Sequence, residues 1–366
     1  MSKYKTVVAR SPIEVGEDLQ VNYNHLLDAT RKWTEILALD PNPQTGLTPK
    51  ETVWRKNKAQ LYRYSSGKET SHLVPVLFLY ALINKAYILD LSPGMSMIEK
   101  LVEDGFDVYL LEWGDFEWED RNLTLTDFIY KYIARAVEKV CQYSHSEELS
   151  IVGYCMGGTM ASMYAALFPK PTIRNLVLLA APITFDQPGT ETKWLNSNFG
   201  QDVDRIVDTF QLVPKEFIDV GLKMLKPVNN FVGTYSRLWK MVEEGGDVNS
   251  WKVLNKWVDD NVNFPGGAYR QWIKDLYQGN KLIKGEFKLG GNAVDLNRIK
   301  ANLLALAGVN DHIVRPPQTK AAMEAMSSVD KEYYEFPIGH GGLVFGNVAK
   351  KKVYPLLSDW LAARSD

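Results

Sequence analysis

The sequence has few cysteines and histidines and no long hydrophobic run. Of its 366 residues, two are cysteine and five are histidine. Two cysteines cannot form the several cross-links on which small secreted domains depend. No stretch approaches the roughly 18 uninterrupted apolar residues that a membrane-spanning helix needs. We therefore expect no disulfide framework and no membrane span. We also expect no metal site, because no histidine and cysteine cluster has ligand spacing.

A strong charge of either sign is also missing. The 42 Lys and Arg residues are nearly balanced by 44 Asp and Glu residues, and the net charge is −2. A protein that binds nucleic acid usually carries a large positive field, so this class is disfavoured. The first residues, MSKYKTVVARSPIEVGEDL, lack the apolar core of a signal peptide. We therefore expect the protein in the cytoplasm.

Strand-like and helix-like segments alternate along much of the chain. A hydrophobic content of 45% is enough for a large core. Alternation of short apolar runs with helical spacing predicts a mostly parallel sheet covered by helices. The clearest strand-like runs lie at residues 74–82, 107–113, 149–154 and 173–183. A further single strand is predicted at 54–64, and the helix that follows 107–113 is predicted to have its cap at Thr126.

The alternation stops after about residue 186 and returns near residue 301, which predicts an insertion. We divide the chain into an N-terminal helical segment, 1–45, an α/β core in two parts, 46–185 and 301–366, and an inserted cap, 186–300. The cap carries five tryptophans, namely Trp194, Trp239, Trp251, Trp257 and Trp272. We expect it to cover an active site and part of it, such as PVNNFVG, to move on binding.

Residues 149–160, LSIVGYCMGGTM, present a cysteine where a strand turns sharply into a helix. Gly153 and Gly157 flank Cys155 at positions where a tight turn leaves no room for a Cβ atom. This is the pattern of a nucleophile elbow, with cysteine in place of the usual serine. The positive end of the following helix favours a thiolate, and the Met156 N–H is a natural oxyanion donor. The other cysteine, Cys141, is predicted to pack in the core.

Two further residues follow Cys155 in the order that an α/β-hydrolase fold requires. Asp311 comes just after a strand-like run, and His340 lies in a glycine-flanked loop after the last strand. The order of nucleophile, acid and histidine therefore predicts a Cys155, Asp311 and His340 triad in an α/β-hydrolase fold. His312 adjoins Asp311, and we expect it to contact substrate. The other histidines, His25, His72 and His145, are expected in solvated positions.

With these motifs, the chain resembles the polyhydroxyalkanoate (PHA and PHB) synthases, specifically the short catalytic subunits that work with a small second subunit. The resemblance runs from about residue 46 to the C-terminus. It is carried by GYCMGGT, YALINKAYILDLSPGMSMIEKLVEDGFDVYLLEWG, YRQWIKDLYQGNKL and NDHIVRP. Together with FVGTY, these motifs make the chain most similar to the Bacillus-type two-subunit enzymes. The histidine loop, GHGGLVFG, departs from the contexts of that group, although the histidine itself is kept.

The resemblance implies an acyltransferase that polymerises hydroxyacyl-CoA, usually 3-hydroxybutyryl-CoA, and releases CoA. It implies that Cys155 carries the growing polyester as a thioester, with His340 as base and Asp311 orienting His340 or assisting the acceptor hydroxyl. The loop after the first buried strand should give a second oxyanion donor, for which we select the Ile83 N–H. No separate cofactor is implied. A small accessory subunit, self-association and a location at polyester granules are further implications.

Two alternatives remain open at this stage. Dienelactone-hydrolase-like enzymes also use a cysteine in a Gly-x-Cys-x-Gly-Gly elbow, but they lack a long cap. A granule-associated scaffold without catalysis would suit the many aromatic residues, but it has no need of three catalytic groups in register. Release of CoA from hydroxybutyryl-CoA, measured together with polymer formation, separates the three possibilities.

Overall fold

The structure is a computed structural model. It describes residues 43–65, 67, 70–169, 172–186, 202–224 and 248–365, together with single positions between 20 and 34. The predicted N-terminal helical segment lies largely outside these residues. So do Trp194, Trp239 and the PVNNFVG stretch at 227–233.

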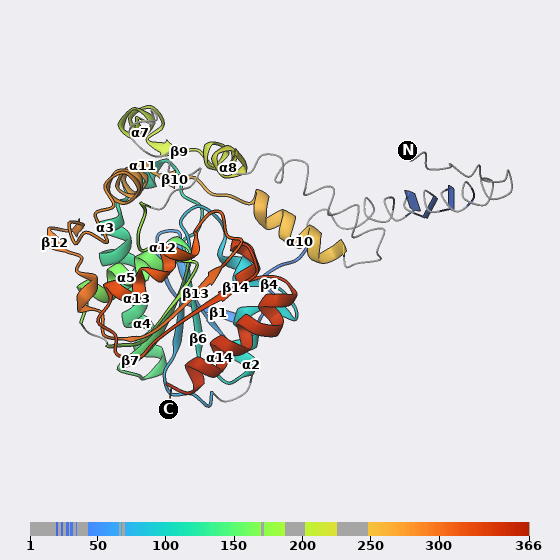
Figure 1. Cartoon of the computed structure of the whole chain (residues 1–366), viewed down its shortest axis with the longest axis horizontal. Helices are drawn as coiled ribbons and strands as arrows, with labels where there is room; N and C mark the ends of the chain where they lie inside the picture. The colour runs from blue at the N-terminus through green and yellow to red at the C-terminus, as the bar shows by residue number, and fades with distance from the viewer. Residues whose placement is uncertain are drawn as a thin grey trace, which may run out of the picture.

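A mostly parallel sheet of eight strands forms the centre of the molecule (Figure 1). The strand order is β1-β2-β6-β3-β7-β8-β13-β14, and all neighbours from β6 to β14 run parallel. The prediction of a mostly parallel sheet is therefore confirmed. The strands are β1 (Lys50–Lys56), β2 (Ala59–Tyr64), β3 (Val76–Leu79), β6 (Val108–Glu112), β7 (Glu148–Tyr154), β8 (Thr172–Leu179), β13 (Asn302–Gly308) and β14 (Lys331–Phe336).

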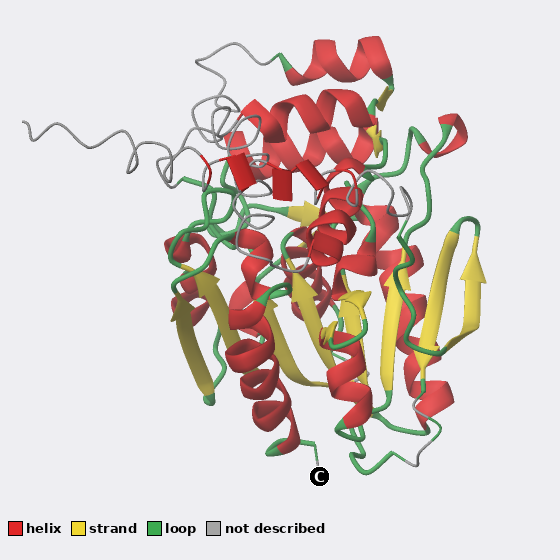
Figure 2. Cartoon of the chain, turned by 90° about the vertical axis from the view of Figure 1, so that its right-hand side faces the viewer, coloured by secondary structure: helices red, strands yellow, loops and turns green. Residues whose placement is uncertain are grey.

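Helices lie on both faces of this sheet (Figure 2). The helix α5 (Met156–Leu167) packs on β3, β7 and β8, whereas α2 (Met97–Glu103) packs against α14 (Tyr354–Ala362). Because both faces are covered, all four residues of β3 are buried. The other helices of the core are η1 (Ala86–Leu89), η2 (Trp118–Asp120), α3 (Leu125–Asp127), η3 (Phe128–Ile133), α4 (Ala134–Ser144), η7 (Leu296–Arg298), α12 (Pro316–Lys320), α13 (Ala322–Ala325), η8 (His340–Leu343) and η9 (Ala349–Val353). Short two-stranded ribbons pair β4 (Asp90–Ser92) with β5 (Met95–Ser96) and β11 (Lys288–Leu289) with β12 (Asn292–Ala293).

Two local predictions were wrong. Residues 54–64 are not one strand but parts of two, because the chain reverses between β1 and β2 in an antiparallel hairpin. Asn57 turns the chain with a φ of 51°, a conformation that asparagine tolerates better than most residues. The cap before α3 is Thr124 rather than Thr126. Thr124 and Asp127 bond to each other's backbone N–H groups, which is the reciprocal arrangement of a capping box.

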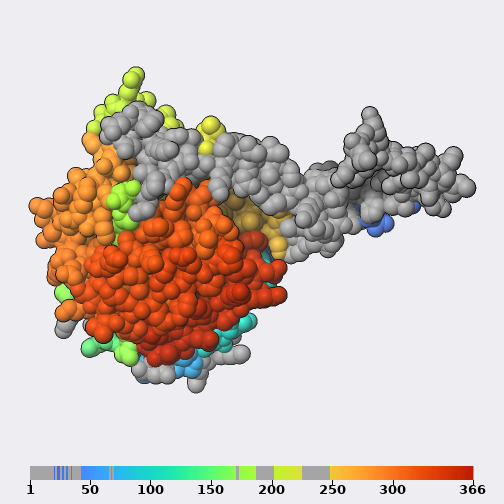
Figure 3. Space-filling view, in the orientation of Figure 1, coloured from blue at the N-terminus to red at the C-terminus, as the bar shows by residue number. Residues whose placement is uncertain are grey.

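Between β8 and β13 the chain leaves the sheet and forms a group of helices beyond the ends of the parallel strands, which point toward it (Figure 2). The described elements of this group are α7 (Val203–Phe210), β9 (Leu212–Val213), α8 (Lys215–Met224), α10 (Val248–Asp259), β10 (Phe264–Pro265), α11 (Gly266–Gln271) and η6 (Trp272–Gln278). In Figure 3 the orange-red C-terminal part of the chain occupies much of the face below the yellow-green part of this group. The boundaries at 186 and 300 stay a prediction.

Polar side chains connect the residues just before this insertion to Asn280, which follows η6. The Asn280 side chain accepts a hydrogen bond from the Phe185 N–H at 2.9 Å and donates one to the Thr184 hydroxyl at 3.2 Å. The buried Gln318 side chain donates to the Thr184 carbonyl at 3.2 Å. The chain therefore leaves the core and returns to it at one place. Among the described residues, no helix is long and apolar enough to cross a membrane.

Candidate active site

Cys155 stands at the sharp turn between β7 and α5. Its φ of 54° and ψ of −127° are unusual for a residue with a side chain, and its N–H donates to the Leu179 carbonyl at 2.9 Å. Strained backbone of this kind persists only where the surroundings hold it, and it is concentrated at functional sites. The predicted elbow is therefore present, with the cysteine at its apex and Met156 as the first residue of the helix.

Close packing explains the glycines beside Cys155. A Cβ atom on Gly157 would lie 2.2 Å from the Leu79 carbonyl oxygen, and one on Gly153 would lie 2.3 Å from the Gly158 Cα. Neither glycine has a positive φ, so space rather than backbone conformation requires them. Because Gly153 and Gly157 lack side chains, α5 can approach β3 and β7 closely enough to place Cys155 at the end of the sheet.

Asp311 and His340 meet at the same end of the sheet. His340 Nδ1 lies 2.7 Å from Asp311 Oδ2. The other oxygen of this buried carboxylate, Oδ1, accepts hydrogen bonds from the backbone N–H groups of Ile313 and Val314 at 2.8 and 2.9 Å. Asp311 follows β13 and His340 follows β14, so neighbouring parallel strands deliver the two residues.

The charge on His340 depends on its two partners. Burial alone would lower the pKa of His340, but the charges of Asp311 and Cys155 and the hydrogen bonds to both raise it well above its ordinary value. A histidine with a raised pKa readily takes a proton from a neighbouring thiol. The geometry therefore brings the three predicted residues into one hydrogen-bonded chain in which a thiolate and an imidazolium can form.

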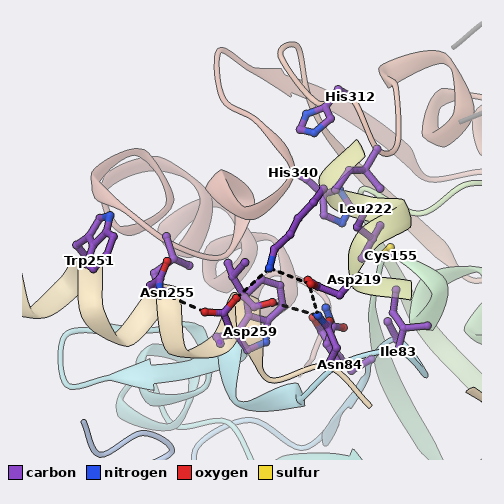
Figure 4. Close-up of a pocket in the computed structure, with 18 residues that line it drawn as sticks. Ile83, Asn84, Cys155, Asp219, Leu222, Trp251, Asn255, Asp259, His312 and His340 are labelled. Carbon is purple, nitrogen blue, oxygen red and sulfur yellow. Dashed lines mark hydrogen bonds and ion pairs between the residues drawn. The ribbon is translucent and has the colours of Figure 1, made fainter. Parts of the chain in front are cut away.

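A cavity of about 420 Å³ opens over Cys155 (Figure 4). The core contributes one part of its wall and the insertion contributes another. From the core come Tyr80, Ile83, Asn84, Cys155, His312 and His340, and from α8 and α10 come Asp219, Leu222, Lys223, Trp251, Leu254, Asn255 and Trp257. Ile83 and His312 thus line the cavity, in agreement with their predicted positions, although their roles stay predictions.

Lys223 connects the two helices of the insertion that line the cavity. Its ammonium lies 2.9 Å from Asp219 in α8 and 3.3 Å from Asp259 in α10. Asn261, just after α10, also donates to Asp219 at 3.3 Å. Nothing in the sequence pattern singled out Lys223, because a lysine and aspartate four residues apart occur on many exposed helices.

The N-terminal part of the chain matches the family described as "Poly-beta-hydroxybutyrate polymerase (PhaC) N-terminus" over residues 15–101. The chain is 39% identical to a poly(3-hydroxyalkanoate) polymerase subunit PhaC of Haloferax mediterranei, over 97% of this chain and 73% of that protein. It is 34% identical to the protein of the same name from Synechocystis, over 94% of each chain. The chain belongs to the PhaC polymerase family. A third relative, the PhaC subunit of Allochromatium vinosum, is 33% identical over 96% of this chain and 99% of its own.

The fold of this chain is that of the α/β-hydrolases. Residues 74–346 match the family described as "alpha/beta hydrolase fold". A putative lipase from Sulfolobus solfataricus superposes with a TM-score of 0.54 at 15% identity, over 86% of this chain and 93% of that one. A monoacylglycerol lipase from Paleococcus ferrophilus gives a TM-score of 0.50 at 16% identity, over 83% and 99%. The predicted fold class is confirmed.

Sequence reasoning missed two aromatic residues of this candidate site. Tyr80 lines the cavity, and Tyr154 contacts His340. The only signal for Tyr154 was its position directly before the nucleophile. Within the part of the chain that the structure describes, no group of three or more His, Cys, Asp or Glu side chains is arranged to hold a metal ion.

Proposed function

We propose that this chain polymerises (R)-3-hydroxyacyl groups, most simply 3-hydroxybutyryl, from their CoA thioesters into a polyester and releases CoA. The observation that carries the proposal is the hydrogen-bonded series from Cys155 through His340 to Asp311 at the floor of the cavity. Membership of the PhaC family supplies the substrate class. CoA enters as part of the substrate and leaves as product, so no separate cofactor is proposed.

The first step transfers the acyl group to the enzyme. Since His340 Nδ1 faces Asp311, Nε2 is the ring nitrogen that takes the proton from the Cys155 thiol. The thiolate attacks the thioester carbonyl, and the new carbon–sulfur bond forms as the bond to the CoA sulfur breaks. The N–H groups of Met156 and Ile83 are the proposed donors to the oxyanion. The imidazolium then returns the proton to the CoA thiolate, which leaves as CoA thiol.

The second step forms the ester bond. His340 removes the proton from the hydroxyl of a further hydroxyacyl group as that oxygen attacks the acyl carbon on Cys155. The Cys155 thiolate is then released, and the imidazolium returns its proton to it. Both Asp311 oxygens are already engaged, one by His340 and one by two backbone N–H groups. This arrangement favours Asp311 as the residue that orients His340 rather than as a second base for the hydroxyl.

His312 and the insertion complete the proposal. His312 lines the same cavity and is proposed to contact substrate. The helices α8 and α10 are proposed to limit the access of water to the acyl-enzyme, because they form part of the cavity wall above Cys155. A small accessory subunit, self-association and a position at the granule surface are proposed from the family resemblance. The exposed Val220 and Met224 of α8, a helix with no buried residue, leave apolar surface available for such partners.

Replacement of Cys155 tests the proposal. Cys155→Ala should abolish CoA release from hydroxybutyryl-CoA while the melting temperature is retained, and Cys141→Ala, the matched control, should be nearly silent. Cys155→Ser should keep little activity, because a hydroxyl is not ionised by the same surroundings. Polymer should form together with CoA in the wild-type reaction. Release of CoA with free hydroxy acid and no polymer would favour a hydrolase, and an active Cys155→Ala variant would refute the assignment.

A further inference from the structure

Tyr154 precedes the nucleophile, but its side chain contacts the base. The residue is 1% exposed, and its hydroxyl donates to the backbone carbonyl of His340 at 3.1 Å. Its ring also lies against the imidazole, with centroids 5.0 Å apart and planes inclined by 30°. The Tyr80 ring in turn stacks on Tyr154, with centroids 5.6 Å apart. The contacts therefore reach both the backbone and the side chain of His340.

Asp311 alone does not fix the direction of His340. A hydrogen bond to one ring nitrogen restrains one point of the imidazole, while rotations about the Cα–Cβ and Cβ–Cγ bonds can still tilt the ring about that point. The position of Nε2, which must meet the thiol, depends on those rotations. The ring of Tyr154 restrains the plane of the imidazole, and the Tyr154 hydroxyl restrains the main chain from which the imidazole projects. These two contacts provide the restraint that Asp311 does not.

We propose that Tyr154 is a positioning residue, which holds the His340 imidazole in line with Cys155. The inference rests on the thiol and imidazole pair of the proposed function. Tyr154 and Cys155 are adjacent at the end of β7, so one strand aligns the nucleophile and, through a ring, its base. The face of an aromatic ring also attracts positive charge, so this contact favours the imidazolium that forms when the thiol ionises.

Alkylation by iodoacetamide at neutral pH tests the assignment without a partner or a polymerising substrate. The rate at Cys155 in the full chain is followed by peptide mass spectrometry for wild type, His340→Ala, Tyr154→Leu, Tyr154→Phe and Tyr164→Leu. Tyr164 is the matched control, because it is also 1% exposed and stacks on an aromatic ring, that of Phe168, but it belongs to α5. Cys141 reports unfolding within each sample, because burial raises its pKa to about 11 and makes it slow to react while the chain is folded.

We expect Tyr154→Leu to slow alkylation of Cys155 about tenfold, toward the His340→Ala rate, because a displaced base removes the thiol proton poorly. Tyr154→Phe keeps the ring and should stay within about threefold of wild type, and Tyr164→Leu should match wild type. A Tyr154→Leu rate equal to or above that of wild type would overturn the assignment, as would an equal loss in Tyr164→Leu. If His340→Ala itself reacts like wild type, the thiol and imidazole pair of the proposed function fails instead.

Discussion

Replacing Gly157 with alanine would place a methyl group against the backbone of β3, directly behind the nucleophile. The new Cβ atom would lie 2.2 Å from the Leu79 carbonyl oxygen, 2.5 Å from its carbon and 2.7 Å from the Tyr80 nitrogen. These atoms belong to a central strand and to the residue after it, so they cannot rotate away as a side chain could. To lengthen the shortest contact to 3.0 Å, α5 must move by about 0.8 Å.

The stability cost follows from this overpacking. Extra methyl groups in a packed core lower the free energy of unfolding by about 1 to 3 kcal/mol. We expect Gly157→Ala near the upper value, because the atoms that its Cβ meets belong to the backbone. A loss of about 3 kcal/mol lowers the melting temperature of a chain of 366 residues by roughly 4 °C. The same displacement carries Cys155 and the Met156 N–H away from the other reacting groups, and an error of about 1 Å in such geometry can reduce a rate about 100-fold.

Melting temperature and CoA release are therefore measured together for Gly157→Ala. The control is Gly221→Ala in the middle of α8, where a Cβ meets no atom within 4 Å. Alanine is favoured over glycine in a helix by about 1 kcal/mol, so this control should melt at the same temperature or slightly higher. If Gly157→Ala melts within 1 °C of wild type and retains full activity, then the glycine is not required by the close approach of α5 to β3.

Two other predictions concern charge and assembly. Asp311→Asn removes the charge that helps to raise the pKa of His340, so this pKa should fall. The stability that the raised pKa provides is fully present below the ordinary value of 6.5 and is lost as pH rises through the raised value. The wild-type advantage in free energy of unfolding should therefore shrink as pH rises above 6.5, and an advantage that grew with pH would contradict this. The isolated chain should turn over slowly and gain activity with its proposed small subunit; full specific activity of the chain alone across a protein-concentration series would count against that partner.

Local sequence patterns were enough to predict the sheet and the elbow. The apolar runs that form β3, β6, β7, β8 and β13 are short and bounded by turn residues. The Gly-x-Cys-x-Gly-Gly motif of the elbow lies within six consecutive residues, so it can be recognised without the fold. The hairpin at residues 54–64 was missed because the strand-like alternation continues through the Asn57 turn. The cap at Thr124 was missed although its spacing from Asp127 is that of a capping box, and this signal could have been used.

Other features could not be predicted because they depend on residues far apart in the chain. Tyr154 and the carbonyl that it contacts are 186 positions apart, so their meeting follows from the sheet order rather than from any pattern near Cys155. The position of Lys223 in the cavity wall could not be predicted for the same reason, because its contact with Asp259 joins two helices of the insertion. Chain order could place Cys155, Asp311 and His340 in one site, but only the fold shows that each oxygen of Asp311 already has a hydrogen-bond partner.

The hydrogen bonds that join Thr184 and Phe185 to Asn280 hold the two ends of the inserted segment side by side, and a bond from the Val262 N–H to the Ile83 carbonyl joins its interior to the core. Since its two ends are fixed side by side, its length and sequence can change without altering the distance that the core must span. Cys155, Asp311 and His340 all lie outside this segment, whereas α8 and α10 within it form part of the cavity wall. Cavity-lining residues of α8 and α10 can therefore be substituted without a change to Cys155, Asp311 or His340 themselves.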